Sequence, residues 1–268
     1  MKKEKKTYYY QTYNDDFVET QDPNYKLPED YIWIHNNIIY KICSRILYFI
    51  AYIFGVIYCK LFLHVKVQNR RILKKYKNTG YFLYGNHTQP LGDVFIPSRV
   101  TRTKRTYVIG NPTNLKVKGI GPFLPIIGIL PIPNSIMKMK ELLKAVGTRI
   151  EEKNVVVIYP EAHVWPYYTK IRPFSDGSLK FQVDLKVPSF CMTTTYYKRK
   201  LGTKPGVKVF LDGPFLVDDN ISKKENQKKL CSQIYKAMVE RSKNSTYEYA
   251  QYIEKNKVKS DIYFKYDL

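Results

Sequence analysis

A histidine and an aspartate follow an apolar run in the first third of the chain. The run Tyr81–Gly85 ends at Asn86 and His87, and Asp93 comes six residues after the histidine. A neutral imidazole that a carboxylate holds in one tautomer is a general base. No serine or cysteine lies beside His87 as an obvious nucleophile. The pair therefore predicts proton abstraction from a hydroxyl or a water that arrives with the substrate, without an acyl-enzyme.

A second apolar run, Val155–Tyr159, leads into Pro160, Glu161 and His163. We expect the Glu161 carboxylate to hydrogen-bond a hydroxyl or to fix a basic partner. For His163 a substrate contact or a satisfied structural group is favoured over a catalytic role. Both apolar runs read as buried strands, and in open α/β sheets ligands bind at the carboxyl ends of the strands.

Basic residues follow the second run, and Lys170 and Arg172 fit a phosphate site because a guanidinium binds phosphate in a bidentate manner. A run rich in Pro and Gly spans residues 119–135, and we expect a loop, a helix and a turn there rather than a regular strand. This run would wall an acyl-chain tunnel, with Asn134 and Ser135 at a polar head group. It is equally possible from the sequence that this run is a buried connection without contact to a substrate.

The elements that must position these residues alternate as in α/β proteins. The length of 268 residues favours one domain. Residues 223–241 carry an amphipathic pattern that predicts a helix packed on the body. The expected strands are 81–85, 107–110, 155–159, 189–196 and 207–211, and the expected helices are 93–100, 137–152, 177–185 and 223–241.

A long apolar segment precedes them, at residues 38–65. Its core, Ile46–Cys59, has no charged residue and is flanked by Arg45 and Lys60. A straight bilayer span needs about 20 residues, so this core favours an interfacial or re-entrant membrane helix. A span with Lys60 snorkelling and a helix buried in the protein core remain open. The basic cluster after the segment supports the membrane.

Lys and Arg number 45 against 23 acidic residues, which gives a formal charge of +22. Such an excess favours a polyanionic partner, although a lysine-rich solvated surface explains part of it. No RNA-binding or helix-turn-helix signature is present, so anionic lipid is expected rather than nucleic acid. Four scattered cysteines and no secretory signal indicate the cytoplasmic side.

Taken together, four ordered segments resemble the 1-acylglycerol-3-phosphate acyltransferase family of glycerolipid acyltransferases. The family has an Asn-His-x4-Asp block, a Gly-rich apolar block that ends in a basic residue, a Phe-Pro-Glu-Gly-Thr-Arg block and a Val-Pro block. The corresponding segments here are Asn86-His87 with Asp93, Gly128 to Asn134, Tyr159 to Ala162, and Val187-Pro188.

The chain departs from the family pattern at three places. Five residues rather than four separate His87 from Asp93, so a turn must absorb one extra residue. Asn134 stands where the family has an arginine that helps to hold phosphate. Ala162, His163 and Val164 replace Gly-Thr-Arg, so a second arginine is missing. The resemblance thus implies conserved transfer chemistry with a differently recognised head group, for which Lys170, Arg172 and His163 would compensate.

The resemblance implies a single α/β domain with a mixed β-sheet flanked by helices and an N-terminal membrane-associated helical segment. The expected parts are a polar arm (1–30), the membrane segment (31–66), the catalytic domain (67–245) and a tail (246–268). His87 with Asp93 would transfer an acyl group from acyl-CoA or acyl carrier protein to a lysophospholipid, Glu161 would orient the acceptor, and no metal or other cofactor is needed. A catalytically inactive lipid-binding relative and a lipid hydrolase with a metal at His87, Glu161 and His163 are the alternatives.

Overall fold

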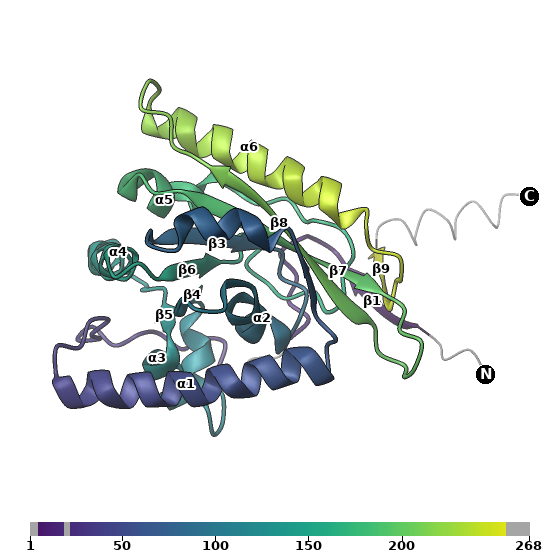
Figure 1. Ribbon diagram of the computed structural model, residues 1–268, viewed down its shortest axis with the longest axis horizontal. Coiled ribbons are helices and arrows are strands. Elements are labelled where there is room, and N and C mark those ends of the chain that lie inside the picture. Colours follow the sequence, from purple (N-terminus) through teal and green to yellow (C-terminus); the bar gives the residue numbers. More distant parts are fainter. Residues whose placement is uncertain (1–4, 19–21, 256–268) are drawn as a thin grey trace, which may run out of the picture.

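The computed structural model describes residues 5–18 and 22–255, which are built around a mixed β-sheet (Figure 1). The seven strands lie in the order β2-β8-β7-β3-β6-β4-β5. β8 runs antiparallel to β7, and the other neighbouring pairs are parallel. The strands are β2 (Lys66–Gln68), β3 (Tyr81–Gly85), β4 (Thr106–Gly110), β5 (Ile129–Pro131), β6 (Val155–Ile158), β7 (Ser189–Tyr197) and β8 (Gly206–Phe215).

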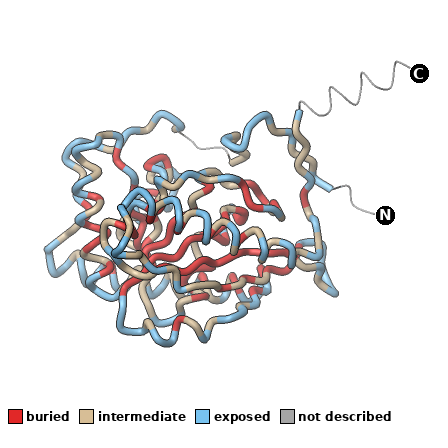
Figure 2. Tube along the Cα trace, turned by 90° about the horizontal axis from the view of Figure 1, so that it is seen from above, coloured by how far each residue is buried: buried red, intermediate tan, exposed pale blue. Residues whose placement is uncertain are grey.

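Helices cover both faces of the sheet, and Figure 2 shows the buried residues concentrated in the layer between them. Successive side chains of a strand point to opposite faces. Tyr81 and Leu83 of β3 therefore belong to one core, and Phe82 and Tyr84 to the other. The helices are α1 (Ile38–Leu61), α2 (Gly92–Thr101) and η1 (Arg70–Tyr76) on the first side, and α4 (Ile136–Glu151), α5 (Lys180–Leu185) and α6 (Lys223–Ser242) on the second.

The predicted fold class and the predicted strands and helices are confirmed, with small shifts at their ends. The prediction for residues 119–135 is wrong in one respect. That run contains η3 (Gly121–Phe123) and α3 (Leu124–Ile127), but also β5, which pairs with β4. Pro131 is tolerated because β5 is the edge strand, where a missing N–H breaks no ladder. The short β2 and η2 (Pro112–Lys116) and η4 (Asp176–Leu179) complete the body.

The N-terminal arm and the C-terminal segment pair with each other, which the sequence did not predict. β1 (Lys6–Tyr10) and β9 (Ala250–Glu254) form a separate two-stranded parallel sheet. Tyr252 of β9 stacks on Trp165 with ring centroids 4.9 Å apart, so the pair lies against the loop after β6. The division of the chain into four parts stays a prediction, and residues 1–4, 19–21 and 256–268 lie outside the described residues.

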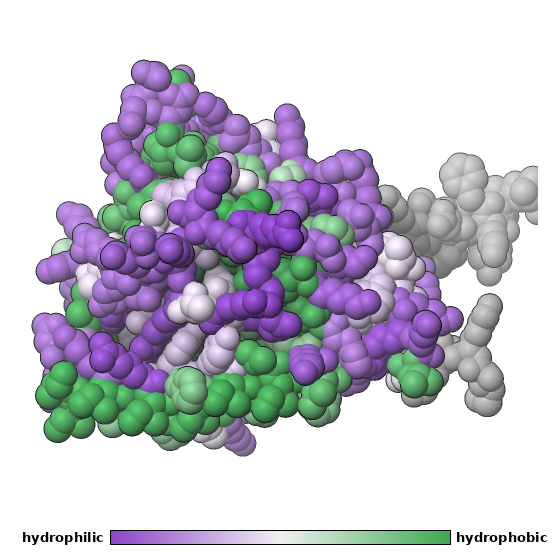
Figure 3. Space-filling model, in the orientation of Figure 1, coloured by the Kyte–Doolittle hydropathy of each residue, from purple (hydrophilic) through white to green (hydrophobic). Residues whose placement is uncertain are grey.

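α1 is one continuous helix with two different sides. Ser44, Gly55 and Cys59 are buried against the body, where α1 packs on α2 and α3. The helix is therefore not buried all round, and the reading of a core helix is wrong. By length and composition it is the one described helix that is able to cross a membrane. Its other side is a continuous apolar band, seen along the lower edge of Figure 3, that contains Ile38, Ile39, Ile42, Ile46, Phe49, Ile50, Ile53, Phe54, Ile57 and Leu61.

Candidate active site

His87 and Asp93 meet at the carboxyl end of β3. His87 Nδ1 lies 2.8 Å from Asp93 Oδ2, and the histidine side chain is 20% exposed while the aspartate is buried. An ionised carboxylate only accepts hydrogen bonds, so Nδ1 carries the proton and the lone pair is on Nε2. The Nε2 atom makes no hydrogen bond with another described residue. A partly open imidazole with a free basic nitrogen is the geometry that a general base needs.

Asn86 fixes the strand end that carries His87. Its side-chain amide donates to the carbonyl of Thr194 at 3.0 Å, and the Thr194 N–H donates to Asn86 Oδ1 at 2.7 Å. The side chain thus continues the β3–β7 ladder by one step beyond the last backbone pairing. The Asn-His sequence therefore serves two purposes, with one residue closing the sheet and the next entering the site.

The Asp93 carboxylate is held by the turn between β3 and α2. Its Oδ2 also accepts the Gln89 N–H at 2.9 Å, and the Asp93 N–H donates to the Gln89 carbonyl at 3.1 Å. This turn absorbs the extra residue between His87 and Asp93. α2 begins at Gly92, and Pro90 lies in the turn that precedes it. Burial raises the pKa of Asp93, and the hydrogen bonds from His87 and Gln89 oppose that rise.

Tyr159 is a site residue that the sequence reasoning missed. Its ring stacks on the His87 imidazole with centroids 4.4 Å apart, and its hydroxyl donates to the Asp93 carbonyl at 2.5 Å. Burial holds the pKa of this hydroxyl well above its ordinary value, so it remains a neutral donor. Gly85 makes room for the ring, because a Cβ there would lie 2.7 Å from Tyr159. The aromatic residue before Pro160 was the available signal.

Glu161 was expected either to bind a hydroxyl, such as that of the acceptor, or to fix a basic partner. Its carboxylate is fully buried and is paired with Arg172, as the second alternative predicts. One oxygen accepts the His87 N–H at 3.1 Å and the guanidinium of Arg172 at 3.0 Å. The other oxygen accepts the backbone N–H of Arg172 at 2.9 Å. Burial raises the pKa of Glu161, and the charge of Arg172 lowers it. The geometry indicates that Glu161 positions the backbone of His87 rather than the substrate.

Arg172 was predicted to bind phosphate, yet its side chain is 1% exposed and is paired with Glu161. The guanidinium also donates to the carbonyls of His163 and of Tyr13, the latter at 3.2 Å. An arginine with these partners is not open to a substrate phosphate. Its role in the structure is to tie the loop after β6 to the N-terminal arm.

No hydrogen bond or ion pair joins the other predicted binding residues, His163, Lys170 and Asn134, to one another in the described part of the chain. His163 contacts Asp16 of the arm, with Nδ1 3.2 Å from Oδ2, and its side chain is 34% exposed. Lys170 is exposed, and its side chain has no ion pair with another described residue. Asn134 is exposed just before α4, at the end of β5, and lines a cavity of about 210 Å³ with Lys26 and Lys138. Strand spacing places β5 about 14 Å from β3 along this edge.

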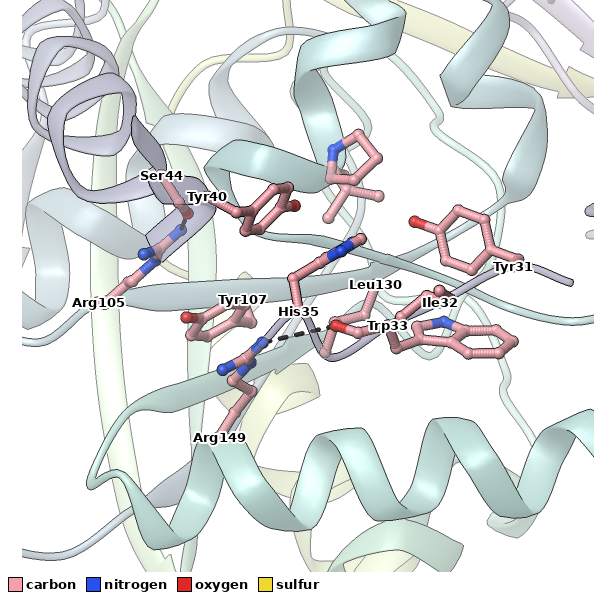
Figure 4. A pocket seen from close by; sticks show the side chains of 12 residues that line it. Tyr31, Ile32, Trp33, His35, Tyr40, Ser44, Arg105, Tyr107, Leu130 and Arg149 are labelled. Atoms are coloured by element: carbon pink, nitrogen blue, oxygen red, sulfur yellow. Dashed lines mark hydrogen bonds between the residues drawn. The ribbon is translucent and has the colours of Figure 1, made fainter. Parts of the chain in front are cut away.

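A second cavity lies at β4 and β5, towards the amino ends of these strands (Figure 4). Arg105 and Arg149 flank the ring of Tyr107, each 4.9 Å from its centroid. Arg105 donates to the Ser44 hydroxyl of α1 at 2.7 Å, and Arg149 donates to the carbonyl of Trp33. The cavity measures about 20 Å³, which is enough for one water molecule. These arginines therefore join α1, β4 and α4 and do not form a substrate site.

The described residues contain no group of three or more His, Cys, Asp and Glu side chains that is arranged to hold a metal ion. The hydrolase alternative placed a metal at His87, Glu161 and His163. Glu161 is instead committed to Arg172, and His163 faces Asp16. The donor set that this alternative requires is not assembled.

Comparisons with known proteins find a similar family model and a similar fold. The acyltransferase family model matches residues 64–195, a range that contains His87, Asp93 and Glu161. No curated protein matches the chain. Among solved structures, the 1-acyl-sn-glycerophosphate (LPA) acyltransferase PlsC from Thermotoga maritima has a similar fold. Its TM-score is 0.55 at 16% sequence identity, over 80% of this chain and 86% of that chain.

Proposed function

We propose that the chain is an acyltransferase of the 1-acylglycerol-3-phosphate acyltransferase type, because the acyltransferase family model matches residues 64–195 and the fold is similar to that of PlsC. It is a glycerolipid O-acyltransferase that moves a fatty acyl group from acyl-CoA or acyl carrier protein to the hydroxyl of a lysophospholipid. The observation that carries this proposal is the 2.8 Å contact between His87 Nδ1 and Asp93 Oδ2, with Nε2 free at a partly exposed edge.

His87 Nε2 takes the proton of the acceptor hydroxyl while the oxygen attacks the thioester carbonyl. The tetrahedral intermediate then collapses, the C–S bond breaks, and the thiolate leaves with the proton that His87 returns. General-base help of this kind contributes roughly 10²–10⁴-fold in rate. Asp93 stabilises the imidazolium that forms, and the stacked ring of Tyr159 fixes the orientation of the His87 imidazole. The chain's own side chains supply every proton transfer in this scheme, so no further cofactor enters it.

Membrane association places the acceptor within reach of this site. Phe54, on the apolar band of α1, contacts Phe95 of α2 with ring centroids 5.5 Å apart, and Phe95 is two residues from Asp93. Leu91, in the turn before α2, is 46% exposed. We therefore propose that α1 lies in the interface of an anionic bilayer at the cytoplasmic face. A lysolipid would then approach His87 along α1 and α2 without leaving the membrane.

The acceptor's phosphate would meet side chains that differ from those of the family. Lys170 and His163 follow β6 at the edge where His87 lies, and Asn134 lies farther along that edge. We propose Lys170 and His163 as head-group contacts, because Arg172 is already paired with Glu161. Lys170→Ala should raise the KM for a phosphate-bearing acceptor and leave the KM for the thioester unchanged.

The test is acyl transfer by purified protein from labelled acyl-CoA or acyl carrier protein to a panel of lysolipids and uncharged monoacylglycerols. The proposal expects a labelled diacyl product with a phosphate-bearing acceptor. A comparison of the rates with the two donors shows whether acyl-CoA or acyl carrier protein is the preferred thioester. Thioester consumption without a diacyl product would favour a hydrolase. Binding of lipid with no consumption of any donor would favour an inactive relative.

A further inference from the structure

The hairpin that joins β7 to β8 is basic and ends in an exposed apolar side chain. Lys198, Lys200 and Lys204 are exposed, and Leu201 at the tip is 86% exposed. Arg199 bends back and donates to the Lys204 carbonyl at 2.7 Å. None of these four cations forms an ion pair with another residue of the described chain. A single exposed leucine is common on protein surfaces, so its position relative to α1 decides whether it matters.

The hairpin is attached to the C-terminal end of α1. The Tyr197 hydroxyl donates to the His64 carbonyl at 3.0 Å, and the Val207 N–H donates to the Leu63 carbonyl at 3.0 Å. Phe62, which follows α1, is itself 62% exposed. In Figure 1 the tip of the hairpin lies beyond this end of α1 and at its level. The apolar band of α1 therefore continues, through Phe62, towards the hairpin.

We propose that this hairpin is a second membrane anchor, whose lysines bind anionic lipid head groups while Leu201 enters the interface. This proposal rests on the proposed membrane association of α1. It adds that the lipid head groups are anionic and that the hairpin is a second point of contact. A single interfacial helix is free to roll about its own axis. A second point beside its end stops that motion and fixes the body, including the first turn of α2 with Asp93, relative to the bilayer.

Fluorescence quenching tests the position of the tip. The chain has two tryptophans, Trp33 and Trp165, and both are buried. In Leu201→Trp protein on vesicles of phosphatidylcholine and phosphatidylglycerol with brominated acyl chains, we expect quenching of the added indole. Leu216→Trp is the matched control, because Leu216 is 55% exposed but follows the far end of β8. Equal quenching in the two variants, or none at residue 201, would overturn the proposal.

Charge neutralisation tests the lipid partner. Lys198→Gln with Lys200→Gln should lower partitioning onto anionic vesicles roughly 25-fold, because each lysine near the surface contributes about fivefold. Partitioning onto pure phosphatidylcholine should not change. The matched control is Lys228→Gln with Lys236→Gln on α6, the helix on the opposite side of the molecule from α1 (Figure 1). An equal loss in both pairs would show a general charge effect and contradict a specific anchor.

These measurements do not depend on turnover, so they separate this proposal from the proposed reaction. A hairpin that contacts lipid in a protein without acyl transfer would leave the anchor standing and reject the reaction. Full acyl transfer with no lipid contact at residue 201 would reject the anchor and leave the proposed reaction standing. In detergent micelles the lysine variants should keep wild-type turnover, since no residue of the hairpin belongs to the site.

Discussion

His87 is oriented by three side chains from two separate segments, the start of α2 and the loop after β6. Asp93 holds its ring nitrogen, Tyr159 stacks on its face, and Glu161 accepts its backbone N–H. Only the first of these contacts follows from a spacing in the sequence. From the sequence, the Glu161 carboxylate was equally suited to bind a substrate hydroxyl. In the structure it is paired with Arg172 instead, and no local sequence pattern predicts this pair.

The buried pair of Glu161 and Arg172 gives a stability prediction. Arg172→Met should lower the free energy of unfolding by about 3–5 kcal/mol, because it leaves the Glu161 carboxylate buried without its cation. Urea denaturation in detergent measures this. The double variant Arg172→Met with Glu161→Gln should recover part of the loss. Lys170→Met, two residues away and exposed, is the control and should change stability by less than about 0.5 kcal/mol.

Asp93 gives a pH prediction whose sign follows from its raised pKa. Between the ordinary value of 3.8 and the higher folded value, the carboxyl is ionised when unfolded and protonated when folded. In this interval a rise in pH stabilises the unfolded state relative to the folded state. The contribution of Asp93 to the free energy of unfolding is therefore complete below pH 3.8 and is lost as the pH rises through the folded pKa.

Asp93→Asn removes that dependence. The unfolding free energy of the wild type minus that of Asp93→Asn should therefore fall as the pH rises from 4 towards neutrality, and then become constant. Denaturation curves of the two proteins at a series of pH values measure it. A difference that rises over this interval would mean that His87 and Gln89 outweigh burial and that the folded pKa lies below 3.8.

At the scale of elements, the central strands and α6 could be predicted because their patterns are local. Apolar runs such as Val155–Ile158 identify strands buried on both faces, and the periodicity of α6 identifies its packed side. β5 could not be predicted, since three residues that end in Pro131 show no strand pattern. The β1–β9 pair joins residues at opposite ends of the chain, and no local pattern reports such a pairing.

The arm is predicted to stabilise the loop after β6. Tyr10 of β1 contacts Trp165 with ring centroids 4.9 Å apart, and Trp165 donates its backbone N–H to the His87 carbonyl. Tyr10→Ser should lower the free energy of unfolding by about 1–2 kcal/mol through the lost aromatic pair and its buried area. Tyr9→Ser is the matched control on the same strand, because Tyr9 is exposed. Equal stability of the two variants would contradict a packed arm.

For the whole molecule, the charge of +22 and the apolar band of α1 both support the proposed partner, an anionic bilayer. The sequence left open whether residues 38–65 span a membrane or lie in it. The structure favours the second, since α1 keeps one side on α2 and α3 and exposes the other as a continuous band (Figure 3). In the proposed interfacial placement, the site at the carboxyl end of β3 would lie one helix away from the lipid.

The most direct test of the account is acyl transfer by His87→Ala protein beside the wild type, from labelled thioester to a lysophospholipid. The control is His64→Asn, which changes an exposed histidine and retains a residue that tolerates its positive φ of 49°. We expect loss of at least about 10²-fold in kcat for His87→Ala, with an unchanged unfolding transition, and wild-type turnover for the control. Normal turnover by folded His87→Ala protein would contradict general-base catalysis by this histidine.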